Sequence, residues 1–196
     1  LLDLKILQDK KDESSSFFDD LKNRKFKLLY LLGSDNLEFQ RNDEFIVYQG
    51  SHGDRGAEIA DLILPSATYT EQNGLYENLE GRIQECKKAS YPIGEALEDW
   101  KIFNQIIKKL GFKDYKVNFD ELRKEVLETA PNFSGINELP KKSVIKTNNI
   151  ETSFFSEKIF VRELDYYYTN SISRSSKTMS ECRQIRQKIK KDGTNN

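Results

Sequence analysis

Three short runs of apolar residues, each closed by turn-forming residues, constrain the fold of this chain more than any other feature. The runs lie at residues 27–32, 45–48 and 61–64, and Gly or Pro follows each within two residues. Each run is too short for a stable helix, and none alternates between apolar and polar residues, which is typical of strands covered on both faces. Such strands occur in parallel sheets with helices on either side. We therefore predict an α/β fold with an open, mostly parallel sheet flanked by helices.

Beyond the third run, the sequence predicts two short strands and two helices. Asn73-Gly74 and the weaker Glu80-Gly81 are turn signals, so two short strands or extended segments are expected around them. The clearest helix is predicted at residues 95–110, where spacings of three and four place five apolar side chains on one face: Trp100, Phe103, Ile106, Ile107 and Leu110. A second helix is predicted at residues 120–129 with three side chains directed inward: Leu122, Val126 and Leu127.

The last third of the chain differs in composition. Residues 130–157 are rich in Pro, Asn, Ser and Lys, which predicts a long irregular connection. A short strand is predicted at 159–161, and a tail helix at 173–191 carries a thin apolar stripe: Met179, Cys182, Ile185 and Ile189. We therefore expect a partial α/β domain at 1–129, and an irregular connection with a C-terminal helical tail at 130–196.

The basic residues of the tail indicate solvation or docking on an acidic protein. A membrane surface is a weaker candidate, because the apolar stripe has no Trp, Phe or Leu.

Charge and hydropathy exclude several classes of protein. The 31 basic residues nearly balance the 32 acidic ones, whereas a dedicated nucleic-acid binder usually shows a basic excess. No run of about 18 apolar residues occurs, so no segment is predicted to span a bilayer. The two cysteines, Cys86 and Cys182, are far apart, which favours reduced thiols over a disulfide framework.

A glycine-rich segment after the second run is the most conspicuous motif. It supplies six candidate residues for cofactor binding: Gly50, His52, Gly53, Asp54, Arg55 and Gly56. One hypothesis is a phosphate-binding loop or a His–Asp acid/base pair at the end of a strand. The spacing matches neither the dinucleotide fingerprint nor the P-loop. We favour a tight turn in which glycine adopts positive φ, so the loop is kept only as a vestigial candidate.

No other motif predicts catalysis or a metal site. An iron–sulfur cluster needs about four thiolates, and this chain has two. Cys86, Cys182 and His52 lack the spacing of zinc ligands. We therefore expect inert thiols, no catalytic residue and no cofactor in this chain. An acidic stretch is predicted to hold helix-start and turn residues on a solvated face: Glu77, Glu80, Glu95, Glu98 and Asp99.

Several motifs resemble the molybdopterin oxidoreductase superfamily. In order and spacing they follow its series over about 40 residues: IADLILP at 59–65, TEQNGLYENLEGRIQ at 70–84, PIGEA at 92–96 and DW at 99–100. Three segments are similar to one branch, the large iron–sulfur subunit of respiratory complex I: LYLLGSD at 29–35, YQGSHGDRGA at 48–57 and YTNSISRSSKTMSEC at 168–182. One departure is Leu75, where the superfamily usually has Thr.

The resemblance implies a scaffold role without a catalytic residue. In that family the clusters lie in an N-terminal region with Cys-rich motifs, which this chain does not contain. The C-terminal region descends from a cofactor-binding fold but carries no molybdopterin in complex I. The resemblance also implies a mitochondrial location, on the matrix side of the inner membrane within a membrane-attached complex.

The resemblance further implies that the family's α/β domain begins upstream of Leu1. We therefore expect a split subunit whose strands are covered through an interface like a divided core. The expected partners are the N-terminal, cluster-bearing fragment of the same subunit and other subunits of the peripheral arm of complex I.

Two other functions stay open at this point. One is a fragment of a true molybdopterin-dependent oxidoreductase that binds a pterin cofactor through residues 50–56. The other is a free-standing α/β protein that binds a nucleotide or phosphate. Bound molybdenum or tungsten would favour the first, and co-migration with a membrane-attached complex would reject the second.

Overall fold

The computed structural model describes residues 17–34, 39–113, 115–116, 118–139 and 165–193. The chain divides into two compact units, Leu1–Pro140 and Lys141–Asn196. The domain limits expected from sequence, 1–129 and 130–196, stay a prediction.

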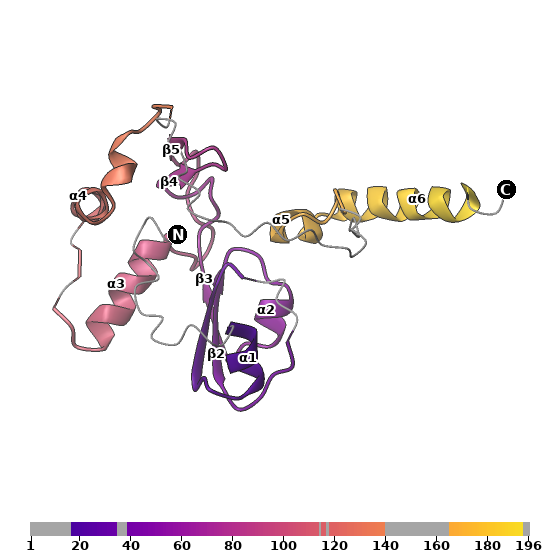
Figure 1. The fold of residues 1–196 in the computed structure, drawn as a ribbon, viewed down its shortest axis with the longest axis horizontal. Helices are drawn as coiled ribbons and strands as arrows, with labels where there is room; N and C mark the ends of the chain where they lie inside the picture. Colours follow the sequence, from indigo (N-terminus) through magenta and orange to yellow (C-terminus); the bar gives the residue numbers. More distant parts are fainter. Residues whose placement is uncertain (1–16, 35–38, 114, 117, 140–164, 194–196) are drawn as a thin grey trace, which may run out of the picture. The chain divides into compact units, whose positions relative to one another are not determined.

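A parallel three-stranded sheet forms the centre of the first unit. Its strands β1 (Leu28–Leu32), β2 (Phe45–Gly50) and β3 (Leu62–Pro65) lie in that order and all run parallel. Two short helices, α1 (Phe17–Lys22) and α2 (Arg55–Glu58), lie on one side of the strands, and α3 (Asp99–Lys109) lies on the other (Figure 1). The predicted α/β fold with a parallel sheet flanked by helices is confirmed.

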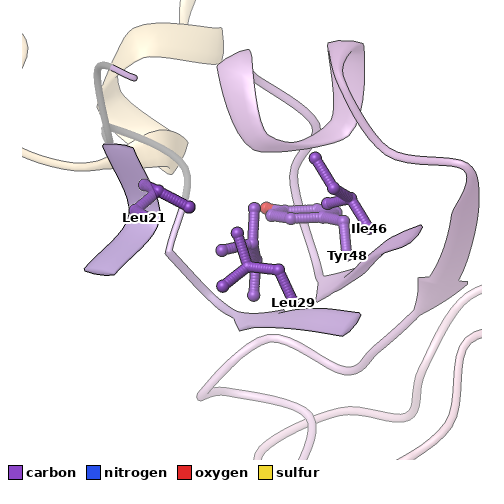
Figure 2. Packing of buried hydrophobic residues seen from close by; sticks show 5 residues of the cluster. Leu21, Leu29, Ile46 and Tyr48 are labelled. Atoms are coloured by element: carbon purple, nitrogen blue, oxygen red, sulfur yellow. The ribbon is translucent and has the colours of Figure 1, made fainter. Parts of the chain in front are cut away.

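The core lies between the sheet and the two short helices. It consists of five buried side chains: Leu21, Leu29, Leu31, Ile46 and Tyr48. Figure 2 shows Leu21 of α1 facing the side chains of β1 and β2, with the Tyr48 ring at the centre of the cluster. Burying a large apolar side chain contributes about 1.5–3 kcal/mol, so this small cluster is what fixes the short helices to the strands.

The three strands differ in how well they are covered. Four consecutive residues of β2 are buried, from Ile46 to Gln49, so coverage on both faces is confirmed for this strand. Within the described residues β3 is not covered in this way, because Leu62 is 44% exposed and Ile63 on the opposite face is 52% exposed. Among the residues that the structure describes, no helix covers β3.

An antiparallel hairpin follows the sheet. Strand β4 (Gly74–Glu77) pairs with β5 (Ile83–Cys86), which confirms the two short strands expected here. The Asn78 side chain closes the turn, since its Oδ1 accepts hydrogen bonds from the backbone N–H groups of Glu80 and Arg82. Gly81 adopts φ 81° in this turn, a conformation that favours glycine.

Both predicted helices are present, α3 at Asp99–Lys109 and α4 at Phe119–Thr129. Asn118 caps α4 by accepting a hydrogen bond from the Glu121 N–H at 2.9 Å, and the 3-10 helix η1 (Pro131–Ser134) follows. The expected inward face of α3 is partly wrong. Ile102 is its buried residue, whereas Leu110 lies just beyond the last helical residue and is exposed.

Among its described residues, the second unit contains two helices, α5 (Ser171–Ser175) and α6 (Lys177–Gly193). The single helix predicted at 173–191 is interrupted at Ser176, whose backbone is extended with ψ 121°. Asn170 and Ser173 form a capping box that starts α5. The strand predicted at 159–161 and residues 140–157 of the predicted connection lie outside the described residues. No helix in the described part of the chain has the length and apolar character needed to cross a membrane.

Candidate functional site

The glycine-rich loop lies at the carboxyl end of β2 and is closed by Tyr48. The Tyr48 hydroxyl donates a hydrogen bond to the His52 carbonyl oxygen at 2.7 Å. A Cβ added at Gly50 would collide with the Tyr48 hydroxyl, and one added at Gly56 would lie 2.8 Å from the Ser34 carbonyl oxygen and 2.9 Å from the Tyr48 ring. Packing against Tyr48 therefore accounts for both glycines without a ligand.

The remaining loop residues form a turn that leads into α2. The Ser51 hydroxyl and His52 Nδ1 lie within hydrogen-bond distance at 3.0 Å. The Asp54 carbonyl oxygen accepts hydrogen bonds from the N–H groups of Ala57 and Glu58, and Arg55 is the first residue of the helix. This geometry suits the tight turn favoured from sequence, but the expected positive φ is wrong, because the described glycines with positive φ lie elsewhere, at residues 33, 81, 94 and 111. The vestigial cofactor site at residues 50–56 stays a prediction.

A partly buried polar junction, which the sequence analysis did not predict, lies beside this loop. Its centre is Asp99, at the start of α3. Gln49 of β2 donates to Asp99 Oδ1 at 2.7 Å, and Gln72 donates to Asp99 Oδ2 at 2.9 Å. The Asp99 N–H donates in return to Gln72 Oε1 at 3.2 Å, and the Tyr30 hydroxyl donates to Gln49 Oε1. The junction thereby fastens α3 and the segment before β4 to the sheet.

The junction affects the tyrosine that lies within it. Burial, and then the negative charge of Asp99, raise the pKa of Tyr30 above its ordinary value of 10.0, so its hydroxyl stays a donor at neutral pH. The Tyr30 ring also stacks on Phe103 of α3, with centroids 5.6 Å apart. Both carboxylate oxygens of Asp99 already accept hydrogen bonds, so this arrangement is suited to holding elements together.

A buried carboxylate, Glu98, lies next to Asp99 in the sequence. It is 5% exposed and accepts hydrogen bonds from Trp100 Nε1 at 2.9 Å, Lys101 Nζ at 3.0 Å and Lys88 Nζ at 3.4 Å. Burial raises the pKa of Glu98, but the hydrogen bonds from Trp100 and Lys101 outweigh it and hold that pKa below the ordinary value. The prediction that Glu98 lies on a solvated face is therefore wrong, because three donors compensate its burial.

A hollow of about 370 Å³ lies among β4, α3 and α4. Its lining is mainly apolar and includes six apolar side chains: Leu75, Trp100, Phe119, Leu122, Val126 and Phe133. Asp99 is one of its polar lining residues. Burial, and then charges on Cys86 and Asp99, raise the pKa of Tyr76 at its margin.

The described residues show no arrangement of metal ligands. No three His, Cys, Asp or Glu side chains gather in the described part of the chain in a way that could hold a metal ion. Cys86 and Cys182 are both free thiols.

Five apolar side chains of the sheet, four on one face and one on the other, are about half exposed among the described residues. In a parallel sheet, paired residues point to the same face, so Leu28 and its partner Phe45 lie with Leu32 and Leu62 on the α3 side. These side chains and Ile63 on the opposite face are between 44% and 58% exposed. We name these five residues the uncovered sheet surface. Single exposed apolar side chains are common, whereas several side by side mark an interface.

Two family models match this chain. One is described as molybdopterin oxidoreductase and matches residues 3–109, and the other describes the C-terminal region of the G subunit of NADH-ubiquinone oxidoreductase and matches residues 129–182.

Three relatives illustrate the similarity. The NADH-ubiquinone oxidoreductase 75 kDa subunit of Reclinomonas americana is 39% identical over 160 residues, covering 80% of this chain and 23% of the relative. The G subunit of NADH-quinone oxidoreductase from Rickettsia bellii is 40% identical over 168 residues, covering 85% and 24%. The mitochondrial NADH-ubiquinone oxidoreductase 78 kDa subunit of Neurospora crassa is 38% identical over 175 residues, covering 83% and 23%.

This chain thus spans about a quarter of the length of the curated relatives it matches. The match to the first family model covers more than half of the chain and includes the whole parallel sheet, the loop and the polar junction. The chain therefore belongs to the molybdopterin oxidoreductase family.

Proposed function

We propose that this chain is the C-terminal structural part of the large iron–sulfur subunit of respiratory complex I, which passes electrons from NADH to ubiquinone. The support is the similarity of 38–40% to proteins named as subunits of NADH-quinone and NADH-ubiquinone oxidoreductase, over 80–85% of this chain. The family model for the C-terminal region of the G subunit adds an independent match at residues 129–182.

Within that subunit, the chain acts as a scaffold and holds no redox centre. Its two cysteines are too few for a cluster, which takes about four thiolates. Asp99 and Glu98 accept hydrogen bonds that join elements of the fold. The rival function, a pterin site in the loop at residues 50–56, has less support because Tyr48 already occupies the space beside Gly50 and Gly56.

The partner is the N-terminal, cluster-bearing part of the same subunit, carried on a separate polypeptide, together with other peripheral-arm subunits. The observation that supports this is the uncovered sheet surface, where Leu62 and Ile63 expose apolar side chains on both faces of β3. A surface of this kind fits an interface that resembles a domain core cut in two. The assembly lies on the matrix side of the mitochondrial inner membrane, in line with the mitochondrial relative from Neurospora crassa.

Native electrophoresis of membranes that express an epitope-tagged chain tests the assignment. The tag is expected in the band that oxidises NADH. Absence of the tag from that band would contradict membership of the complex.

Metal analysis of the same band separates the scaffold from the pterin hypothesis. We expect iron in the band and no stoichiometric molybdenum or tungsten. Either metal bound in a one-to-one ratio with this chain would contradict the scaffold role.

A further inference from the structure

A small hollow in the second unit combines aromatic and cationic side chains. It has a volume of about 270 Å³, with Tyr166 and Tyr167 on one side and α6 on the other. Helix α6 contributes Arg183, Arg186 and Lys190. These positions are three and seven residues apart, so they share one face of the helix.

The wall of the hollow is fixed by Arg183. Its Nε lies 2.5 Å from Asp165 Oδ2, and its guanidinium lies 4.5 Å from the centroid of the Tyr168 ring. Asp165 Oδ1 also accepts a hydrogen bond from the Tyr167 N–H at 3.2 Å. Residues 165–168 are thereby held against α6, and Arg183 is paired with the carboxylate of Asp165.

Positive charge exceeds negative charge around the hollow. Residues 165–190 include six basic residues, at 174, 177, 183, 186, 188 and 190, and two acidic ones. Both carboxylates already lie near cations, Asp165 at Arg183 and Glu181 at 3.9 Å from Lys177. No carboxylate among the described residues lies within ion-pair distance of Arg186, which sits 5.8 Å from the centroid of the exposed Tyr166 ring. The surface therefore offers a cation beside an aromatic face.

An exposed apolar stripe borders this cationic face. Ile189 is 66% exposed and lies three residues after Arg186 and four after Ile185, so the three side chains are neighbours on the helix surface. Ile185 and Met179 are exposed as well. A partner that covers the isoleucines therefore brings its own polar groups to Arg186.

We infer that this surface of α6 docks an acidic, amphipathic segment of a partner protein. A carboxylate of that segment binds Arg186 over the Tyr166 ring, and its apolar side chains cover Ile185 and Ile189. The inference goes beyond the proposed function, which assigns no contact to the tail. It uses only residues of the second unit, so its failure would leave the proposed function intact.

Size and charge favour a protein segment over other occupants. Small-molecule sites usually measure about 300–1,000 Å³, so this hollow suits one or two side chains. The stripe contains Met and Ile but no Trp, Phe or Leu, which leaves a membrane surface without the usual apolar anchors. The net charge of −1 for the whole chain opposes binding to a nucleic acid.

Fluorescence anisotropy with the full chain, fused to an inert solubility partner, tests the inference. The probe is a labelled synthetic helix with glutamates along one face and isoleucines along the adjacent face. We expect saturable binding that Arg186→Glu weakens about tenfold, and that the milder Arg186→Gln weakens less. Lys188→Glu is the matched control, because it makes the same charge change on the opposite side of α6 and is expected to alter binding less than about twofold.

Each other result overturns the inference. If Lys188→Glu lowered the peptide affinity as much as Arg186→Glu, the binding would be general charge attraction. If a scrambled peptide bound as tightly as the designed helix, the apolar stripe would have no role. Tighter binding to single-stranded DNA or to phosphatidylserine vesicles, lost in Arg186→Glu, would assign the surface to a nucleic acid or a membrane. Absence of peptide binding, with unchanged helical circular dichroism, would leave no docking site.

Discussion

Strands β2 and β3 arise from the same kind of sequence, yet they differ in their surroundings. Both are short apolar runs closed by turn residues, and they pair with each other in parallel. In β2, Ile46 is completely buried, whereas Leu62 and Ile63 of β3 are about half exposed. β2 also lies between two strands, whereas β3 has a neighbouring strand on one side only.

This contrast indicates that the apolar pattern of a strand depends on the surroundings of that strand in the assembled protein. An isolated surface strand usually alternates between apolar and polar residues, and β3 does not. The sequence of β3 therefore suits a covered position that the described residues do not supply.

The largest expected effect is at the centre of β2. Ile46→Ala removes a buried side chain and is expected to lower the free energy of unfolding of the isolated chain by about 3 kcal/mol. Ile63→Ala, on the neighbouring strand, is expected to cost less than about 1 kcal/mol. Urea denaturation monitored by circular dichroism measures both, and equal losses would remove the contrast between the strands.

The next effect concerns the junction that fastens α3 to β2. Asp99→Ala leaves Gln49 and Gln72 without their shared acceptor and is expected to cost about 2 kcal/mol. Glu128→Ala, on the exposed side of α4, serves as the control and is expected to change stability by less than about 0.5 kcal/mol. Similar urea midpoints for the two variants would show that the junction does not support the sheet.

A smaller, pH-dependent effect is expected from Glu98. Its pKa in the folded chain lies below the ordinary 4.5, so it stabilises the fold above pH 4.5, and this contribution is lost as the pH falls through the folded-state pKa. Glu98→Gln removes the titration. The difference in urea midpoint between wild type and Glu98→Gln is therefore expected to shrink on acidification below pH 4.5. A difference that grows there would contradict the assigned direction of the pKa shift.

The smallest effect is expected at the start of β3. Arg41 donates to Asp61, whose other oxygen accepts a hydrogen bond from the Ile46 N–H at 2.8 Å. The hydrogen bond from Arg41 holds the pKa of Asp61 below its ordinary value of 3.8. This contact is exposed and screened by solvent, so Arg41→Ala is expected to lower the urea midpoint by less than Ile46→Ala or Asp99→Ala does. A loss as large as that of Ile46→Ala would mean that β3 is anchored as firmly as β2.

Apolar patterning and turn residues were enough to predict the strands and the two longer helices of the first unit. They could not predict the junction, because Gln49 and Asp99 are 50 residues apart and meet only through the path of the chain. The burial of Glu98 was not predicted either, because Lys88, ten residues away in sequence, reaches it only in the folded chain. The glycine loop could be interpreted as a turn from its spacing, but the role of Tyr48 required the packing around Gly56.

Thiol labelling at β3 tests directly whether another polypeptide covers this strand in the complex. Ile63→Cys, in a chain whose two cysteines are replaced by serine, is compared with Lys124→Cys on the exposed side of α4. We expect maleimide to label both sites rapidly in the isolated chain. In the assembled complex, labelling at residue 63 is expected to slow at least about tenfold relative to residue 124, because burial removes access to the thiolate. Equal labelling rates at residue 63 in the isolated and assembled chain would contradict the claim that another polypeptide covers this strand.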